Sequence, residues 1–361
     1  MGPWISSADP GRLHAEGRMA RYALEEAREQ VAALFGTRPR QVVFTSGATE
    51  AINAATFGAL ADRPGPVVLS AVEHSAVRES SERYGTSVQV LGADRYGRIR
   101  PDEIGSALAA GRASLLHCQL ANHEVGTIQP VEEIMSLAAL EGGGEIGSRP
   151  FVHVDAAAAA GHLPIRFDEL GADLMSVSAH KLGGPRGVGA LLVRRGLRLP
   201  PFILGGSQER ARRAGLENVA AAVGFGAAAG VLAGALSAEA EAAEALTARL
   251  RASAEAITDV TVYCHPDREA RLPHLVCLGI GGVEAEPVLI GLDQAGVAAH
   301  SGSSCSSESL EPSPVLEAMG VDAEHSLRLS VGWSTTGAEV DLASNALPEV
   351  VGRLRRLWAG A

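Results

Sequence analysis

Lysine is almost absent from this chain of 361 residues: 31 residues are lysine or arginine, and Lys181 is the single lysine. The excess of arginine, together with many alanines and 42 glycines, is typical of a GC-rich coding bias. Such a bias replaces lysine wherever only a positive charge is needed, so surface charge does not explain Lys181. A reaction that needs a primary amine would explain it, because arginine cannot form an imine.

Basic runs and paired cysteines are also missing. With a net charge of −11 and no cluster of basic residues, the chain is a poor match for nucleic acid or an anionic membrane as its main partner. Its four cysteines include no CxxC pair, which disfavours a zinc site or a disulfide framework. We therefore expect no metal, reduced thiols and a cytoplasmic location.

Long apolar runs and aromatic residues are scarce as well. We find no apolar stretch near the roughly 20 residues of a membrane span. The N-terminus lacks the charged-then-apolar order of a signal peptide, so we expect no membrane association. Aromatic residues make up 4% of the chain and hydrophobic residues 46%, with alanine prominent. This composition favours close packing of helices over an aromatic-rich β-sandwich.

Short apolar segments alternate with helical patterns from about residue 18 to 200. Several of these segments are continuously apolar, as expected for strands that helices cover on both faces. The alternation predicts a mainly parallel α/β sheet. The predicted strands are QVVFTS (41–46), PVVLS (66–70), SVQVLG (87–92), SLLHCQLA (114–121), FVHVDAA (151–157), LMSVSA (174–179) and GALLVRR (189–195).

An alanine-rich helical stretch from about residue 217 to 256 separates this pattern from the rest of the chain. It is long for one globular helix, so we expect two helices or one long helix that links two domains. After it, VTVYC, HLVCLGIGG, GVAAHSG and LRLSVGW are short predicted strands between helical segments. We therefore predict a large α/β domain at 15–245 and a smaller α+β domain at 246–361, to which residues 1–14 also belong.

Polar residues follow several predicted strands, at the edge of the sheet where ligands bind in such folds. In FTSGATEAIN a strand ends and a helix begins, so backbone N–H groups and the Thr49 hydroxyl suit a phosphate, although an ordinary helix N-cap fits equally well. His74 follows PVVLSAV directly and is either a ring-stacking residue, an acid or base, or a structural histidine. Asp155 ends an apolar strand and requires a cationic or protonated partner, unless it caps a helix over the alanines that follow.

Three more positions carry chemistry. Lys181 follows Ser178 and His180 at the end of an apolar strand, where partial burial favours the unprotonated amine that forms an imine with an aldehyde. Cys305 lies in the Ser/Gly-rich stretch HSGSSCSSESL, which suits an accessible nucleophilic thiol. Arg328 inside LRLSVGW requires an anion, either a substrate carboxylate or a structural partner. Together these are the parts of a pyridoxal-phosphate site that works on an amino acid and passes a group to a cysteine.

The motifs around these positions resemble the cysteine desulfurases of the class V aminotransferase group, which have the type I pyridoxal-phosphate fold. The matching motifs occur in the family's order between about residues 12 and 356: FTSGATEAIN, VEHSAV, ANHEVGTIQPV, HVDAAAAAG, ADLMSVSAHKLGGPRGVGAL, GGSQERARRAGLEN, SGSSCSSESLEPSPVL and LRLSVGWSTT. The cysteine segment resembles the subgroup with a long cysteine loop. The resemblance implies pyridoxal 5'-phosphate as cofactor, conversion of L-cysteine to L-alanine, sulfur transfer to a protein acceptor, and a homodimer.

The resemblance also implies a role for each matching residue. Lys181 would form the Schiff base with the cofactor, Asp155 would pair with the pyridinium nitrogen, and His74 would stack on the ring and take part in catalysis. Cys305 would accept the sulfur as a persulfide. The remaining residues would hold the phosphate (Ala48, Thr49, Ser178, His180) or bind the substrate (Arg328, Asn122).

Three positions depart from the family's usual Asn, Gln and Thr, since this chain has His123, Ala158 and Leu216 there. We hypothesise that His123 replaces the contact to the cofactor's phenolic oxygen that is lost at Ala158. Selenocysteine lyase, aminotransferase and β-lyase chemistry are alternatives within the group, although none of them needs a cysteine on a Ser/Gly-rich loop. A degenerate sulfur-relay or scaffold subunit is a further alternative, which the replacements at 158 and 216 favour.

Overall fold

The structure is a computed structural model that describes residues 8–110, 113–140, 149–301 and 312–359. The chain divides into two compact units. The first unit takes in the chain up to Leu91, then Pro101–Leu120 and Pro130–Leu236; the second takes in Gly92–Arg100, Ala121–Gln129 and the chain from Ser237 on. The last boundary falls inside one helix, α8 (Val219–Glu255).

The first unit is built on a seven-stranded sheet in the order β1-β7-β6-β5-β4-β2-β3. Neighbours from β6 to β3 are parallel, and β7 pairs antiparallel with both β1 and β6. Every strand except β7 therefore ends at the same edge of the sheet. The strands are β1 (Val42–Thr45), β2 (Val67–Ser70), β3 (Val88–Leu91), β4 (Leu115–Gln119), β5 (Phe151–Asp155), β6 (Leu174–Ser178) and β7 (Gly189–Val193).

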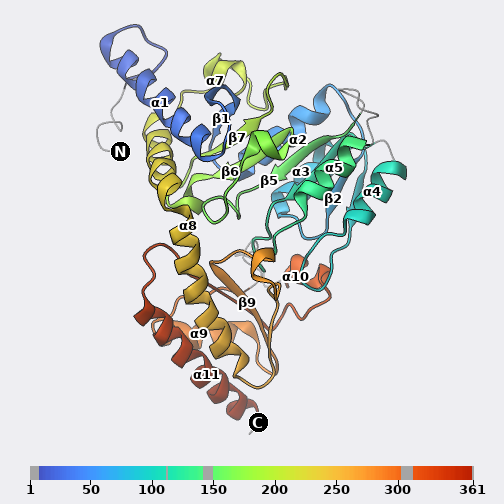
Figure 1. Cartoon of the computed structure of the whole chain (residues 1–361), viewed down its shortest axis with the longest axis vertical. Helices are drawn as coiled ribbons and strands as arrows, with labels where there is room; N and C mark the ends of the chain where they lie inside the picture. The colour runs from blue at the N-terminus through green and yellow to red at the C-terminus, as the bar shows by residue number, and fades with distance from the viewer. Residues whose placement is uncertain (1–7, 111–112, 141–148, 302–311, 360–361) are drawn as a thin grey trace. The chain divides into compact units, whose positions relative to one another are not determined.

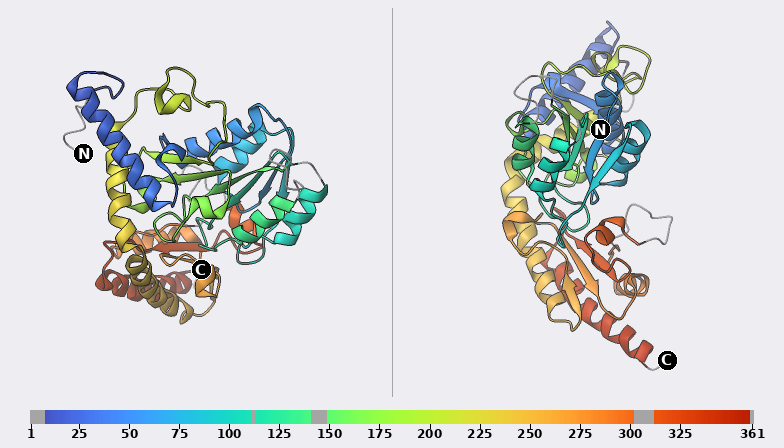
Figure 2. Two further views of the ribbon diagram at one scale, coloured as in Figure 1. Left: turned by 45° about the horizontal axis from the view of Figure 1, so that its top comes forward. Right: turned by 90° about the vertical axis from the view of Figure 1, so that its right-hand side faces the viewer.

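Helices lie on both faces of this sheet, with α2 and α3 on one side and α4 and α5 on the other (Figure 2, right). Buried side chains such as Ile52 and Ala55 of α2 pack on Leu115 and Leu191 of the strands. Burial from both sides explains the continuously apolar strands and confirms the predicted mainly parallel sheet. The helical elements are α1 (Ala15–Leu34), η2 (Pro39–Gln41), α2 (Ala48–Ala61), α3 (Ser75–Tyr84), α4 (Pro101–Ala110), α5 (Val131–Leu140), α6 (Phe167–Leu170), η3 (Ala179–Leu182) and α7 (Gln208–Ala211).

The alanine-rich stretch forms the single helix α8, whose first half runs beside α1 in the first unit (Figure 1). At Gly226 an added Cβ would lie 2.6 Å from the Ala27 Cα, so glycine permits the close approach of the two helices. By length and composition α8 could cross a membrane, with a window of mean hydropathy 2.0, which corrects the expectation that no such stretch exists. The same test is passed by core helices, and 39% of that window is buried in the structure.

The second unit contains a three-stranded antiparallel sheet in the order β10-β9-β8. Its core joins Leu250 of α8 and Val350 of α11 to strand residues such as Leu278 and Leu327. The predicted strand GVAAHSG is wrong, because His300 forms only an isolated bridge to β10 among the described residues of that segment. The elements are β8 (Val260–Val262), η4 (Arg268–Ala270), β9 (Leu275–Ile280), α9 (Ala285–Gln294), α10 (Pro314–Ala318), β10 (Ser326–Ser330) and α11 (Gly337–Ala359).

The division into units differs from the expected boundaries at 14/15 and 245/246. The described residues before α1 belong to the first unit, where Arg21 Nε donates to Pro10 O at 3.2 Å. Two short segments between strands of the first unit belong to the second. They pair with each other there, since Ile99 N donates to Gln129 Oε1 at 2.9 Å. The amino-acid composition does not change at the ends of these two segments, so the sequence did not indicate that they belong to the second unit.

Candidate active site

The turn between β1 and α2 is shaped to hold an anion. Helix geometry leaves the first N–H groups of α2, at Ala48 and Thr49, without intrahelical acceptors, and they carry the positive end of the helix dipole. The turn itself is fixed, since Thr45 Oγ1 donates to Gly47 O at 2.9 Å and Ser46 N donates to Glu50 at 2.9 Å. This geometry suits the phosphate predicted from the sequence.

The end of β6 lies beside this turn. A Cβ placed on Gly47 would lie 3.9 Å from Ser178 Oγ, and one placed on Gly189 would lie 2.8 Å from the Gly47 Cα. Glycine at 189 therefore permits the close approach of β7 to the turn. Ser178 Oγ forms a hydrogen bond with His180 Nδ1 at 2.9 Å. Two of the predicted phosphate ligands, Ser178 and His180, thus lie together and next to the start of α2.

Lys181 follows β6 on the short helix η3, where its side chain is exposed, so the expected partial burial is wrong. Burial, and then the charge of Lys181, lowers the pKa of His162 to about 4. Burial, followed by Lys181 and Arg186, also lowers the pKa of His180. Lys181 therefore has two neutral imidazoles near it at physiological pH. The sequence did not indicate His162, because it stands seven residues after Asp155, beyond the motif HVDAAAAAG.

Asp155 ends β5 and is held by two donors. Ser176 Oγ on β6 and Ala157 N each donate to Asp155 Oδ1 at 3.0 Å. These two donors fix the orientation of the Asp155 carboxyl group. The alternative in which Asp155 caps a helix is wrong, because the alanines after it form turns, with Ala159 N donating to Ala156 O at 3.1 Å.

His74 is the N-cap of α3. Its Nδ1 accepts a hydrogen bond from Ala76 N at 3.0 Å. This bond fixes the direction of the ring and places the proton of the neutral imidazole on Nε2. Because β2 and β5 end at the same edge of the sheet, His74 and Asp155 belong to the same edge.

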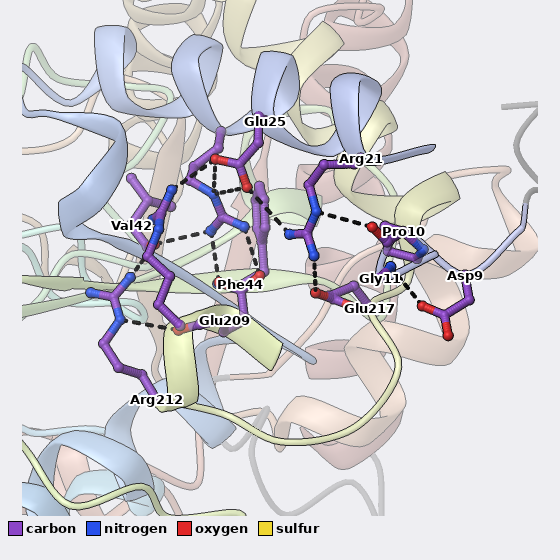
Figure 3. A network of polar contacts seen from close by, with 12 residues as sticks. Asp9, Pro10, Gly11, Arg21, Glu25, Val42, Phe44, Glu209, Arg212 and Glu217 are labelled. Carbon is purple, nitrogen blue, oxygen red and sulfur yellow. Dashed lines mark hydrogen bonds and ion pairs between the residues drawn. The ribbon is translucent and has the colours of Figure 1, made fainter. Parts of the chain in front are cut away.

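The segment between β7 and α8 is anchored by a buried ion pair through Glu209, which is labelled in Figure 3 together with Phe44 of β1. Arg28 Nη1 and Nη2 each donate to Glu209 at 2.7 Å, and Phe44 N on β1 donates to Glu209 Oε2 at 3.0 Å. Residues 209–211 all have positive φ, at 48°, 59° and 61°, which costs energy in residues other than glycine. The buried ion pair holds this strained turn against the strand that leads into the anion-binding turn.

The same segment also reaches the first turn of α2. Arg213 Nε and Nη2 donate to the Glu50 carboxylate at 2.9 and 3.2 Å. Glu50 in turn accepts from Ser46 N, so Arg213 stabilises the anion-binding turn through Glu50. Leu216, where the family commonly has Thr, is 62% exposed.

The second unit contains the predicted substrate residues. Arg328 Nη1 on β10 donates to His123 O at 3.1 Å. Asn122 is buried, and its Oδ1 accepts from Glu124 N and Val125 N at 2.9 Å each. Asn122 therefore shapes the turn that supports His123 and, through it, Arg328.

Cys305 lies outside the described residues, but the described chain on either side of it is fixed in the second unit. Before it, His300 and Arg328 exchange backbone hydrogen bonds of 3.2 and 2.6 Å. After it, Ser313 Oγ donates to the buried Glu124 at 2.5 Å and caps α10. Glu124 Oε1 also lies 3.5 Å from His123 Nε2. His123, Glu124 and Arg328 thus together hold the described chain before and after Cys305.

Comparisons with known proteins agree with this description. The chain matches the family described as Aminotransferase class-V over residues 6–342. It is 38% identical to "Cysteine desulfurase IscS" of Dictyoglomus turgidum, over 99% of this chain and 91% of that protein. Its fold is similar to a NifS-like protein from Rickettsia africae (TM-score 0.87, 27% identity, 97% and 94% of the two chains). It is also similar to "SspA in complex with cysteine" (TM-score 0.78, 28% identity, 91% and 93%). The resemblance and the type I fold predicted from the motifs are confirmed.

Proposed function

The chain belongs to the class V aminotransferase family, and we propose that it is a pyridoxal-phosphate-dependent cysteine desulfurase that converts L-cysteine to L-alanine. Relatives named cysteine desulfurase are 36–39% identical over 97% of the chain, and a similar structure is a complex with cysteine. The observation that carries the proposal is the position of Lys181. The single lysine of the chain follows the strand that lies between the Asp155 strand and the anion-binding turn.

The residues of the first unit fit this cofactor. The start of α2 and Ser178 supply hydrogen-bond donors for a phosphate. Position 189 is a glycine, and any side chain there would collide with the backbone of the turn. Asp155 would pair with the ring nitrogen and His74 would stack on the ring. Lys181 supplies the primary amine for the aldehyde. When bound, the cofactor acts as an electron sink for the substrate's Cα.

Residues of the chain would carry out the remaining steps. Arg328 binds the substrate carboxylate, with its guanidinium oriented by His123 O. Lys181 would act as the general base that removes the Cα proton. Because His162 is neutral at physiological pH, it places no second positive charge beside Lys181 that would lower the basicity of the amine.

Cys305 would then receive the sulfur. Its thiolate attacks the sulfur of L-cysteine, the Cβ–S bond breaks, and a persulfide forms on Cys305 while the carbon skeleton leaves as L-alanine. The persulfide sulfur passes to an acceptor thiol, in a protein, by exchange. His300, before the cysteine segment, pairs with Arg328, and Ser313, after it, is bonded to Glu124. These fixed ends support the proposal that Cys305 takes the sulfur from a substrate bound by Arg328.

We also propose that the protein is a homodimer in the cytoplasm. Large apolar side chains are exposed in the first unit at Leu13 (88%), Met19, Tyr22 and Val231, which a second copy would cover. The cysteines of the described chain are free and buried, which supports a reducing compartment.

Two measurements on the purified protein test the function. We expect a visible absorption band from the bound cofactor, followed by release of alanine from L-cysteine. An aminotransferase would instead give a keto acid, a selenocysteine lyase would need selenocysteine, and a scaffold subunit would release no alanine. A protein that binds the cofactor but forms no alanine from L-cysteine would contradict the proposal.

A further inference from the structure

Glu73, the residue before His74, has a carboxyl group that is completely enclosed in the first unit. Its Oε1 accepts a hydrogen bond from Gln119 N at 2.8 Å. Its Oε2 has no hydrogen-bond partner among the described residues. A charged carboxylate in such a place loses its hydration and regains a single donor, which is far more costly than burying the neutral acid.

A second carboxylate acts on Glu73. Asp155 is the register partner of Gln119 across β4 and β5, and its negative charge acts on Glu73. Two neighbouring carboxylates do not both ionise at low cost. Among the described residues, Asp155 Oδ1 has two donors, whereas Glu73 has one donor and an oxygen without a hydrogen-bond partner. The charge therefore belongs on Asp155 and the proton on Glu73.

The same surroundings shift the pKa of Glu73 in the direction that this assignment requires. Burial raises the pKa of Glu73 to about 8, the Gln119 N–H opposes this rise, Asp155 adds to it and Arg78 opposes it. The groups that face Glu73 come from three elements: Asp155 from β5, Arg78 from α3 and the buried thiol of Cys118 from β4.

Glu73 also joins two strand ends. Its N–H donates to Ser70 O at 3.1 Å, so it closes the turn after β2. Its carboxyl group holds Gln119 N, and Gln119 Nε2 donates back to Val72 O at 2.9 Å. These bonds tie the turn that carries His74 to the end of β4.

We propose that Glu73 is a positioning residue that works as a neutral carboxylic acid: its proton lets Asp155 keep its charge, and its Oε1 holds the turn that carries His74. The roles of Asp155 and His74 toward the cofactor rest on the proposed function. The location of the proton does not.

The proposal predicts a specific dependence of stability on pH. In the unfolded chain Glu73 has the ordinary pKa of 4.5, and in the folded protein its pKa is about 8. The folded state therefore binds the extra proton between these values, and stability is lost as the pH rises through this range. The folding equilibrium constant of the wild type, relative to a variant without this group, should fall about tenfold per pH unit and level off above pH 8.

The test compares Glu73→Gln, which mimics the neutral acid, with Glu82→Gln, which makes the same change at an exposed position of α3. Urea unfolding of each full-length protein would be measured from pH 5.5 to 9. We expect the wild type to lose stability relative to Glu73→Gln over this range, and to keep a constant difference from Glu82→Gln. A difference from Glu73→Gln that does not change with pH would overturn the placement of the proton.

Positioning has its own readout, which is the visible circular dichroism of the bound cofactor. Glu73→Gln keeps the acceptor for Gln119 N and should leave this signal unchanged, whereas Glu73→Ala should reduce it severalfold. Equal signals in Glu73→Ala and the wild type would overturn the positioning role.

If the variants do not fold, infrared spectroscopy of the wild type labelled with 13C-glutamate decides the matter. A carbonyl band of a buried protonated glutamic acid should be present at pH 7 and lost by about pH 9. Absence of the band at pH 7 would overturn the proposal. Neither this measurement nor the unfolding series uses turnover of L-cysteine, so a failure of the proposed activity is recognised separately.

Discussion

Replacement of Arg28 by methionine should destabilise the protein by about 3 kcal/mol. Arg28 and Glu209 are 1% and 3% exposed and share two hydrogen bonds of 2.7 Å. Removing one partner of a buried pair leaves the other charge uncompensated, which costs about 3–5 kcal/mol. Methionine keeps the unbranched stem, so the loss reports the ion pair rather than a cavity.

The strained turn places the expected value at the lower end of this range. Residues 209–211 adopt positive φ only because the turn is held, and each such residue costs on the order of 1 kcal/mol. When Arg28 is gone, the turn relaxes and Glu209 moves toward water, which recovers part of the cost. The relaxed segment also releases Phe44 N, two residues before the anion-binding turn, so the variant should bind the cofactor more weakly.

Urea unfolding measures the effect, with Arg166→Met as the control. The side chains of Arg166 and its partner Glu169 are 60% and 70% exposed, so the loss of this pair should cost less than about 1 kcal/mol. A loss below 1 kcal/mol in Arg28→Met, or one no larger than in Arg166→Met, would refute the reasoning.

Three further predictions concern the site and the core. Lys181→Arg keeps the charge but not the primary amine, so we expect neither a visible cofactor band nor alanine release; a normal band would contradict the assignment. His117 and His153, whose Nδ1 atoms lie 2.8 Å apart, have pKa values lowered by burial, to about 4 for His153. Both are neutral in the folded protein but become protonated on unfolding below pH 6.5, so the free energy of unfolding should fall from pH 6.5 to 4, by about 3 kcal/mol from His153 alone. In urea unfolding, the free energy of unfolding of His153→Leu should depend less steeply on pH than that of the wild type. Ser313→Ala removes the bond to Glu124 and should slow single-turnover persulfide formation about tenfold or more, with unchanged affinity for L-cysteine; an unchanged rate would exclude a positioning role for this bond.

The sequence predicted the sheet and much of the candidate site because both follow from short-range patterns. Strands buried on two faces are continuously apolar, and parallel strands bring the residues after them to one edge. Asp155, Ser178 and Lys181 therefore came from a reading of strand ends alone. One long helix was one of the two predictions for the alanine-rich stretch, and α8 confirms it. The prediction that the chain has no apolar stretch of membrane-spanning length was wrong, because α8 contains one.

Features that depend on long-range contacts did not come from the sequence. Arg28 and Glu209 are 181 positions apart, and nothing in either segment indicates that they form a buried pair. Glu73 stands next to His74 in the motif VEHSAV, but only the folded structure shows that its carboxyl group is completely enclosed. His300 lies in an apolar-looking segment that forms a bridge instead of a strand, because among the described residues it makes one pair of backbone hydrogen bonds, with Arg328.

The central claim is that sulfur moves from L-cysteine to Cys305, and mass spectrometry of the Cys305 peptide tests it most directly. After one equivalent of L-cysteine, the wild-type peptide should carry one additional sulfur atom that a reducing thiol removes. Cys305→Ser should keep the cofactor band, carry no additional sulfur and release no alanine. Alanine release at the wild-type rate from Cys305→Ser, or additional sulfur on another cysteine, would contradict the account.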